Sequence, residues 1–147
     1  MDELTAFARF DRDFRRSNLM WFTETWLTED TGNIFGPGFT RVRADRDSDK
    51  AQQSVGGDLC MFLSDSWATQ YCVRERVCTR DFVLLTVSFR PFYLPRESGQ
   101  ITVIFISVSG PDFKTAAERI MECSSEEISR SVDQPVFILG DLNSCDL

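Results

Sequence analysis

Apolar residues recur every three or four positions near the start of the chain, between residues 2 and 16. These positions are Leu4, Phe7, Phe10 and Phe14. The spacing predicts an amphipathic helix with one aromatic stripe, and we expect that stripe to face a sheet. The next apolar run, residues 19 to 22, is short and has apolar residues on both faces. It predicts a strand that is covered on both sides.

Further short apolar runs predict a series of strands separated by turn-rich or proline-containing connections. The predicted strands are 39–43, 58–63, 69–77, 82–89, 101–106 and 136–139, and the connections include 30–37, 44–55 and an extended or edge segment at 90–97. Between Phe113 and Ile128 the apolar spacing returns to three and four, which predicts a second helix. The order of elements indicates an α/β fold of the α+β type, with packed, mostly antiparallel sheets flanked by helices.

The composition fits one domain. The chain has 147 residues, of which 42% are hydrophobic, and no Pro/Gly/Ser-rich tract marks a linker. Its apolar runs are much shorter than the ~20 residues that a helix needs to cross a bilayer. Asp2 and Glu3 stand where a signal peptide would be basic. We therefore expect one intracellular domain, 1–147, with no membrane partner, and the sequence does not indicate its oligomeric state.

Cysteine, histidine and charge exclude several classes of function. The five cysteines are odd in number and irregularly spaced, which fits reduced thiols better than a disulfide framework. The chain has no histidine and no C-x-x-C pair, which argues against zinc and excludes Ser–His or Cys–His nucleophiles. A net charge of −7 argues against a globally basic nucleic-acid binder. Arginine-rich stretches at 41–50 and 74–90 are interpreted as solvated surface.

Two predicted strands end in polar residues, and these ends form the candidate site. Glu24 follows the strand 19–22. Asp141 and Asn143 follow, after a glycine, the fully apolar strand 136–139, which we expect to be buried. Residues two apart share a face in extended chain, so Asp141 and Asn143 present a carboxylate and an amide on one side. If the strands are neighbours, Glu24 adds a second carboxylate, and such hard oxygen ligands suit Mg²⁺. Taken singly, each motif also fits a solvated glutamate or a simple turn.

Several stretches in this order carry a resemblance to a known family. They are 23–27, 39–46, 56–57, 66–67, 90–97 and 140–143. Together they resemble the endonuclease domains of vertebrate, especially fish, LINE-type (non-LTR) retrotransposons, which belong to the endonuclease/exonuclease/phosphatase superfamily. The resemblance covers essentially the whole chain. It implies a four-layered α/β sandwich of the DNase I and abasic-endonuclease type.

The resemblance also implies roles and partners. Glu24 would bind Mg²⁺, Asp141 would orient or deprotonate the attacking water, and Asn143 would hold the scissile phosphate. The implied reaction is magnesium-dependent nicking of one DNA strand, which leaves a 3′-hydroxyl for target-primed reverse transcription. The implied partners are DNA and, in full-length relatives, a reverse transcriptase domain, and the implied location is the nucleus.

The chain departs from the family pattern at three places. The first strand with its metal-side asparagine and the final Ser-Asp-His motif are absent, and Ser107 stands where relatives carry a tyrosine. Losing several positioned groups together should leave a rate near background, so we expect an incomplete domain that is inactive alone. Two alternatives remain open: a phosphomonoesterase of the same superfamily, and a non-catalytic remnant that binds nucleic acid or protein.

Overall fold

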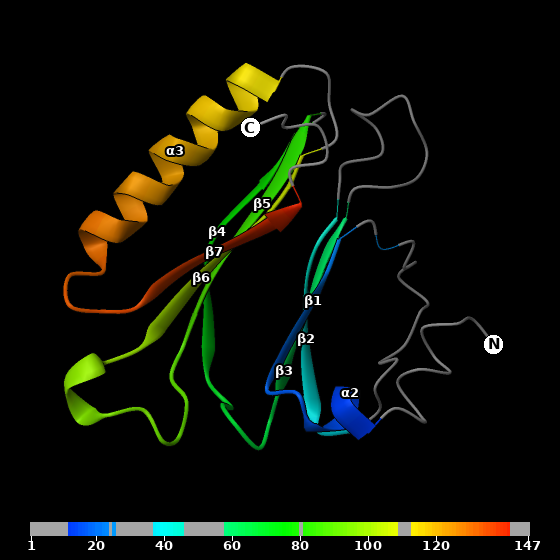
Figure 1. Cartoon of the computed structure of the whole chain (residues 1–147), viewed down its shortest axis with the longest axis vertical. Helices are drawn as coiled ribbons and strands as arrows, with labels where there is room; N and C mark the ends of the chain where they lie inside the picture. Colours follow the sequence, from blue (N-terminus) through cyan, green and yellow to red (C-terminus); the bar gives the residue numbers. More distant parts are fainter. Residues whose placement is uncertain are drawn as a thin grey trace.

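The computed structural model describes residues 12–23, 25, 37–45, 58–79, 81–108 and 113–141. Within these ranges the chain forms two sheets and two α-helices (Figure 1). The predicted helix 2–16 is described only as α2 (Arg12–Arg16), and its remainder lies outside these ranges. No described helix is long and apolar enough to span a membrane.

The smaller sheet contains β1 (Leu19–Phe22), β2 (Phe39–Ala44) and β3 (Leu59–Ser64), in the order β1-β3-β2. Both neighbours pair with β3 in antiparallel fashion, so β1 and β2 run in the same direction. Every residue of β3 is buried, as expected for the central strand of a sheet that is covered on both faces.

The larger sheet has the order β4-β5-β6-β7. Its strands are β4 (Tyr71–Cys78), β5 (Phe82–Phe89), β6 (Ile101–Val108) and β7 (Val136–Asp141). The first three pair in antiparallel fashion, whereas β7 lies parallel to β6. A parallel neighbour requires a crossover, and the helix α3 (Phe113–Arg130) supplies it.

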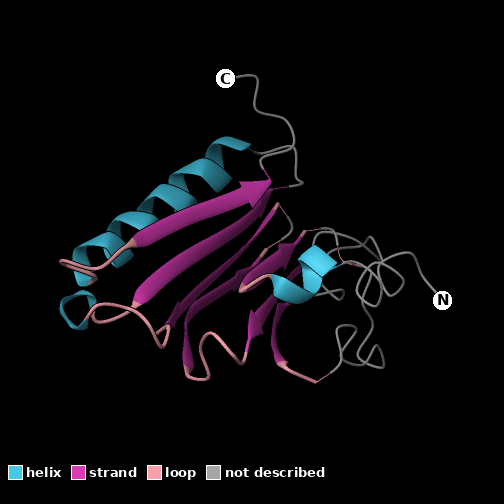
Figure 2. Cartoon of the chain, turned by 60° about the horizontal axis from the view of Figure 1, so that its bottom comes forward, coloured by secondary structure: helices cyan, strands magenta, loops and turns pink. Residues whose placement is uncertain are grey.

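The elements stack in four layers (Figure 2). The main core lies between the two sheets, where Leu63, Leu85 and Phe105 are buried together. Phe14 of α2 packs on the outer face of the smaller sheet, against Met20 and Phe62. The helix α3 packs on the outer face of the larger sheet, where Ala116 and Cys123 join its buried side chains. The predicted α+β fold with four layers is confirmed.

Two sequence-based expectations need correction. The strand 136–139 was expected to be buried, but Phe137 and Ile138, on opposite faces of β7, are each 51% exposed. The cause is position, because β7 is an edge strand of the larger sheet. The segment 90–97 was expected to be extended, but it contains a turn closed by the Leu94 amide, which donates to the Pro91 carbonyl, and a 3₁₀ helix at Arg96–Ser98. Each proline stands at the first position of its turn and accepts the closing hydrogen bond through its carbonyl oxygen, which needs no N–H group.

Candidate active site

One edge of the sandwich collects the ends of five strands. Trp67, just after β3, contacts Phe89 at the end of β5, with ring centroids 5.4 Å apart. The strands β3 and β5 therefore end at the same edge. Their antiparallel partners β1, β2, β4 and β6, together with β7, which runs parallel to β6, end at the opposite edge (Figure 1). We call this the upper edge, and β1 and β7, the two strands that precede the predicted site residues, both end there.

Asp141 is the last residue of β7 and lies at the upper edge, where it is half-buried. The glycine before it allows the close approach of β7 to β6. A Cβ atom on Gly140 would lie 2.9 Å from the backbone carbonyl oxygen of Ile106 and 3.1 Å from the Ile106 Cβ. Any larger residue at this position would have to push β7 away from its neighbour.

Ser107 is the partner of Asp141 in the β6–β7 register. The pair two positions earlier, Phe105 and Leu139, faces the core between the sheets, so Ser107 and Asp141 share that inner face. Ser107 is fully buried, and its hydroxyl has no hydrogen-bond partner. The inward-facing carboxylate of Asp141 therefore lies next to the buried hydroxyl of Ser107, which makes no hydrogen bond.

A second hydroxyl of this kind follows the end of β1 in the facing sheet. The Thr25 amide donates to the Asp58 carbonyl oxygen at 3.4 Å, which holds Thr25 beside the start of β3. Thr25 is buried, and its Oγ1 has no partner. The strands β1 and β6 face each other across the core, because the rings of Trp21 and Phe105 are 6.0 Å apart. Unpartnered hydroxyls thus occur in both sheets at the upper edge.

The predicted residues Glu24 and Asn143 lie outside the described ranges, so the structure places Asp141 alone of the three. Within those ranges, no three acidic, histidine or cysteine side chains gather in a metal-binding group. The described oxygen donors at the upper edge include the carboxylate of Asp141 and the hydroxyls of Ser107 and Thr25. Hard oxygen donors of this kind fit Mg²⁺ and do not fit a soft metal.

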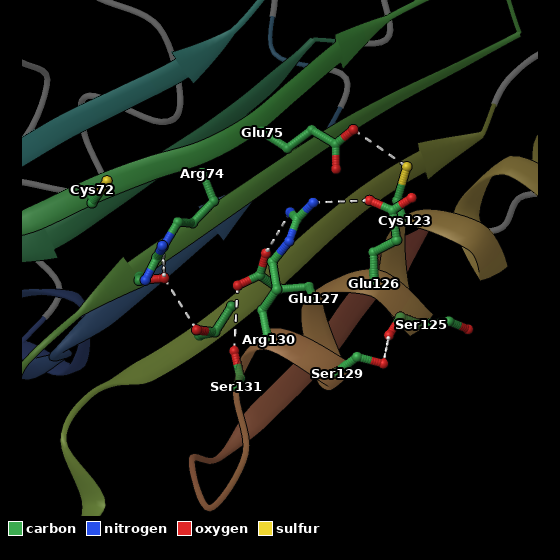
Figure 3. A network of polar contacts seen from close by, with 12 residues as sticks. Cys72, Arg74, Glu75, Cys123, Ser125, Glu126, Glu127, Ser129, Arg130 and Ser131 are labelled. Atoms are coloured by element: carbon green, nitrogen blue, oxygen red, sulfur yellow. Dashed lines mark hydrogen bonds and ion pairs between the residues drawn. The ribbon is translucent and has the colours of Figure 1, made fainter.

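Two buried cysteines, Cys60 and Cys123, are unsuited to the chemistry of this site. Cys60, Cys72, Cys78 and Cys123 are free thiols, as expected from the sequence. Burial raises the pKa of Cys60 to about 12. Burial, together with its hydrogen bond to Glu75 at 3.4 Å, raises the pKa of Cys123 to about 11 (Figure 3). Both thiols remain protonated at neutral pH, and a thiol is a weak nucleophile and metal ligand.

The arginine-rich stretches behave largely as structural surface. Arg43 forms a salt bridge with Asp45 at 2.8 Å. Arg74 donates through Nε to Ser88 at 3.0 Å, and Arg90 donates to the carbonyl oxygen of Gly99. The interpretation of these stretches as ordinary surface therefore accounts for their described contacts.

Sequence reasoning missed the buried hydroxyls of Ser107 and Thr25, since Ser107 was considered only as a lost tyrosine.

These features define the class of fold. Two packed sheets between outer helices, with Asp141 at one edge, form a four-layered α+β sandwich of the DNase I type. A solved structure with this architecture is D. rerio TDP2 humanized by 14 mutations, which superposes with a TM-score of 0.63 at 11% sequence identity. The match covers 97% of this chain and 56% of that chain, so this chain spans little more than half of its structural neighbour. At this identity the likeness shows the fold alone. No family model and no curated protein matches the sequence.

Proposed function

We propose that the chain is part of a magnesium-dependent phosphodiesterase domain, and specifically of a DNA endonuclease like those of LINE-type retrotransposons. The observation that carries the proposal is the inward-facing Asp141 beside the unused hydroxyl of Ser107, at the upper edge of a nuclease-like fold. A carboxylate that can accept a proton, next to a hydroxyl that can hold a water molecule, is an arrangement that general-base catalysis can use.

The proposed roles follow the resemblance. Asp141 accepts a proton from the attacking water, Asn143 holds the scissile phosphate, and Glu24 carries Mg²⁺, which neutralises charge on the phosphate when it is bound. The proposed substrate is DNA, with a reverse transcriptase domain as a partner in longer relatives and the nucleus as the place of action. The likeness to TDP2 supports the fold on which these roles depend.

The open side of the larger sheet supports the proposal that the domain is partial. Phe137 and Ile138 expose apolar surface on both faces of the edge strand β7. On α3, Met121 and Ile128 are also exposed, and residues seven apart lie on the same side of a helix. Parallel strands are normally covered on both faces, so an exposed one is unusual. We therefore propose that the chain alone cleaves DNA at a rate near background.

Magnesium binding and plasmid nicking test the proposal. We expect Mg²⁺ to raise the melting temperature in a saturable way, and Glu24→Ala to remove that rise. Glu97→Ala is the matched control, because it removes an exposed carboxylate from the 3₁₀ helix between β5 and β6, at the opposite edge of the sandwich. If Mg²⁺ leaves the melting temperature unchanged and no nicking occurs, the nuclease proposal is wrong.

A second set of outcomes concerns activity and substrate. Magnesium-dependent nicking of supercoiled plasmid that both Glu24→Ala and Asp141→Ala abolish would establish the endonuclease and overturn the proposal of inactivity. Phosphate release from inositol phosphates without nicking would instead favour the phosphomonoesterase. Both assays use the same protein preparations, so a folding defect in a variant would be seen in both.

A further inference from the structure

The hydroxyl of Ser107 lacks the hydrogen bond that a buried polar group normally has. Ser107 is 0% exposed, yet its Oγ has no partner. Burying a hydroxyl without a hydrogen bond is unfavourable, and most buried polar side chains in proteins are satisfied by protein or water. Its neighbours on the same face of β6, Val103 and Phe105, belong to the core between the sheets, so an apolar side chain would be the ordinary choice for core packing at Ser107 too.

The same sheet shows how this protein satisfies a buried hydroxyl that needs no ligand. Ser88 on β5 and Thr102 on β6 are both buried and bond to each other at 3.1 Å. Arg74 adds a further donor to Ser88 at 3.0 Å (Figure 3). Ser107 lies on the same strand as Thr102, at the upper edge, and receives no such bond. The hydroxyl of Ser107 thus keeps an unused hydrogen bond at an edge of the sheet, where a molecule from solvent can supply the partner.

Asp141 is the polar group that shares this place. It is the register partner of Ser107 on the neighbouring strand, it points to the same inner face, and it is half-buried. The pair therefore offers a carboxylate at the rim and a hydroxyl beneath it. A water molecule between them can donate one hydrogen to the carboxylate and accept one from the hydroxyl. A buried water of this kind needs two or more polar partners, which the pair supplies.

We propose that Ser107 and Asp141 together bind one water molecule, and that this water is the nucleophile of the phosphodiester hydrolysis. The catalytic role rests on the proposed function, whereas the water site does not. The hydroxyl of Ser107 donates to one lone pair of the water, which leaves the other free to attack phosphorus. The new P–O bond forms as the water gives its proton to Asp141. The bond to the 3′-oxygen breaks, and that oxygen leaves with the electron pair and takes a proton from solvent.

Ser107 stands where relatives carry a tyrosine, and it would hold a water molecule through its own hydroxyl. A serine is smaller than a tyrosine and keeps a hydroxyl at this position. The substitution is then an adaptation of the site and not simply a loss. The unpartnered hydroxyl of Thr25 in the facing sheet is a separate sign that the upper edge is built for polar ligands.

A double-mutant cycle tests the water site by urea unfolding. Ser107→Ala should lower the urea midpoint, because a bound water loses one of its partners. Asp141→Asn should also change the midpoint, and the double variant should shift it by no more than the larger single shift, because the water is lost only once. If instead Ser107→Ala raises the midpoint and its effect adds to that of Asp141→Asn, no water joins the two residues.

Ser124→Ala is the matched control. Ser124 is also buried with an unpartnered hydroxyl, but it lies on α3 and not at the upper edge. We expect Ser124→Ala to raise the midpoint, because it removes an unsatisfied group, and to add to Asp141→Asn. A Ser107→Ala variant that behaves like this control overturns the proposal.

The cycle and the activity assays separate the two proposals. Non-additivity between Ser107→Ala and Asp141→Asn supports the water site even if the chain nicks no DNA and binds no Mg²⁺. If the chain does nick DNA, Ser107→Ala should lower kcat by roughly tenfold, the value of one hydrogen bond, at unchanged KM. Equal kcat for the variant and the parent would overturn the catalytic role.

Discussion

Gly140 is the point at which the packing of the larger sheet meets the candidate site. A Cβ atom there would lie 2.9 Å from the Ile106 carbonyl oxygen, and the atom in the way is backbone, which cannot swing aside. Gly140→Ala should therefore force β7 away from β6. Gly140 does not adopt a positive φ, so alanine meets no backbone strain and the effect is steric.

The magnitude follows from two opposing contributions. Overpacking by one methyl group typically destabilises a protein by about 1–3 kcal/mol, and the lower entropy of the unfolded alanine chain returns about 0.4–1 kcal/mol. We expect a net loss in the free energy of unfolding of about 1–2 kcal/mol. For a chain of this length that corresponds to a Tm lower by roughly 2–8 °C.

Urea denaturation followed by circular dichroism measures this loss, with calorimetry as a second measure of Tm. Ile138→Val serves as the control on the same strand, because it removes one methyl group from a half-exposed side chain and should have little effect. A Gly140→Ala protein as stable as the parent, or more stable, would refute the close approach of β7 to β6.

Three further predictions concern the core and the thiols. Leu85→Ala should lower the free energy of unfolding by about 2–5 kcal/mol in urea, since Leu85 is fully buried between the sheets, and a loss below 1 kcal/mol would contradict that packing. Burial raises the pKa of Cys60 from 9.0 to about 12, so the unfolded thiol ionises first and the free energy of unfolding should fall as the pH rises from 9 to 12. Cys60→Ala should reduce this fall in a pH titration of the urea midpoint. The same pH dependence in the variant would contradict the burial of the thiol. Exposed Cys72 should react with a maleimide well before Cys60, as followed by mass spectrometry, and equal rates would show that the smaller sheet opens.

The secondary structure could be predicted where the signal is local. The run Phe82–Phe89 is apolar except at Thr86 and Ser88, because β5 is buried on both faces, and its predicted bounds match the strand. The spacing from Phe113 to Ile128 likewise matches α3, which continues to Arg130. In both elements the residues that carry the pattern are neighbours in sequence, so no knowledge of distant contacts is needed.

Exposure and pairing could not be predicted in the same way. The run 136–139 is as apolar as β5, yet Phe137 and Ile138 are half-exposed, because the order of strands places β7 at an edge. Whether a strand is central or lateral depends on which other strands bond to it, and its own residues do not contain that information. The burial of the strand was therefore the part of the prediction that failed.

The candidate site could likewise be predicted only in part. Asp141 could be placed at a strand end from the apolar run before it, and the structure agrees. Its partner Ser107 is separated from it by the whole of α3, and the pairing is visible only once the parallel register of β6 and β7 is known. The role proposed for the hydroxyl of Ser107 therefore could not be inferred from its residue type or from its neighbours in sequence.

The register also links the stability of β7 to the chemistry proposed for Asp141. Within the described part of the chain, β7 is held by its ladder to β6, its close contact at Gly140 and the packing of Leu139 and Val136. A displacement of β7 would carry the carboxylate of Asp141 away from the hydroxyl of Ser107. In a Gly140→Ala background we therefore expect the non-additivity between Ser107→Ala and Asp141→Asn to disappear, because a single water can no longer reach both groups. If the coupling survives at full strength while the protein is destabilised, the water does not bridge the two strands, and the destabilisation comes from packing alone.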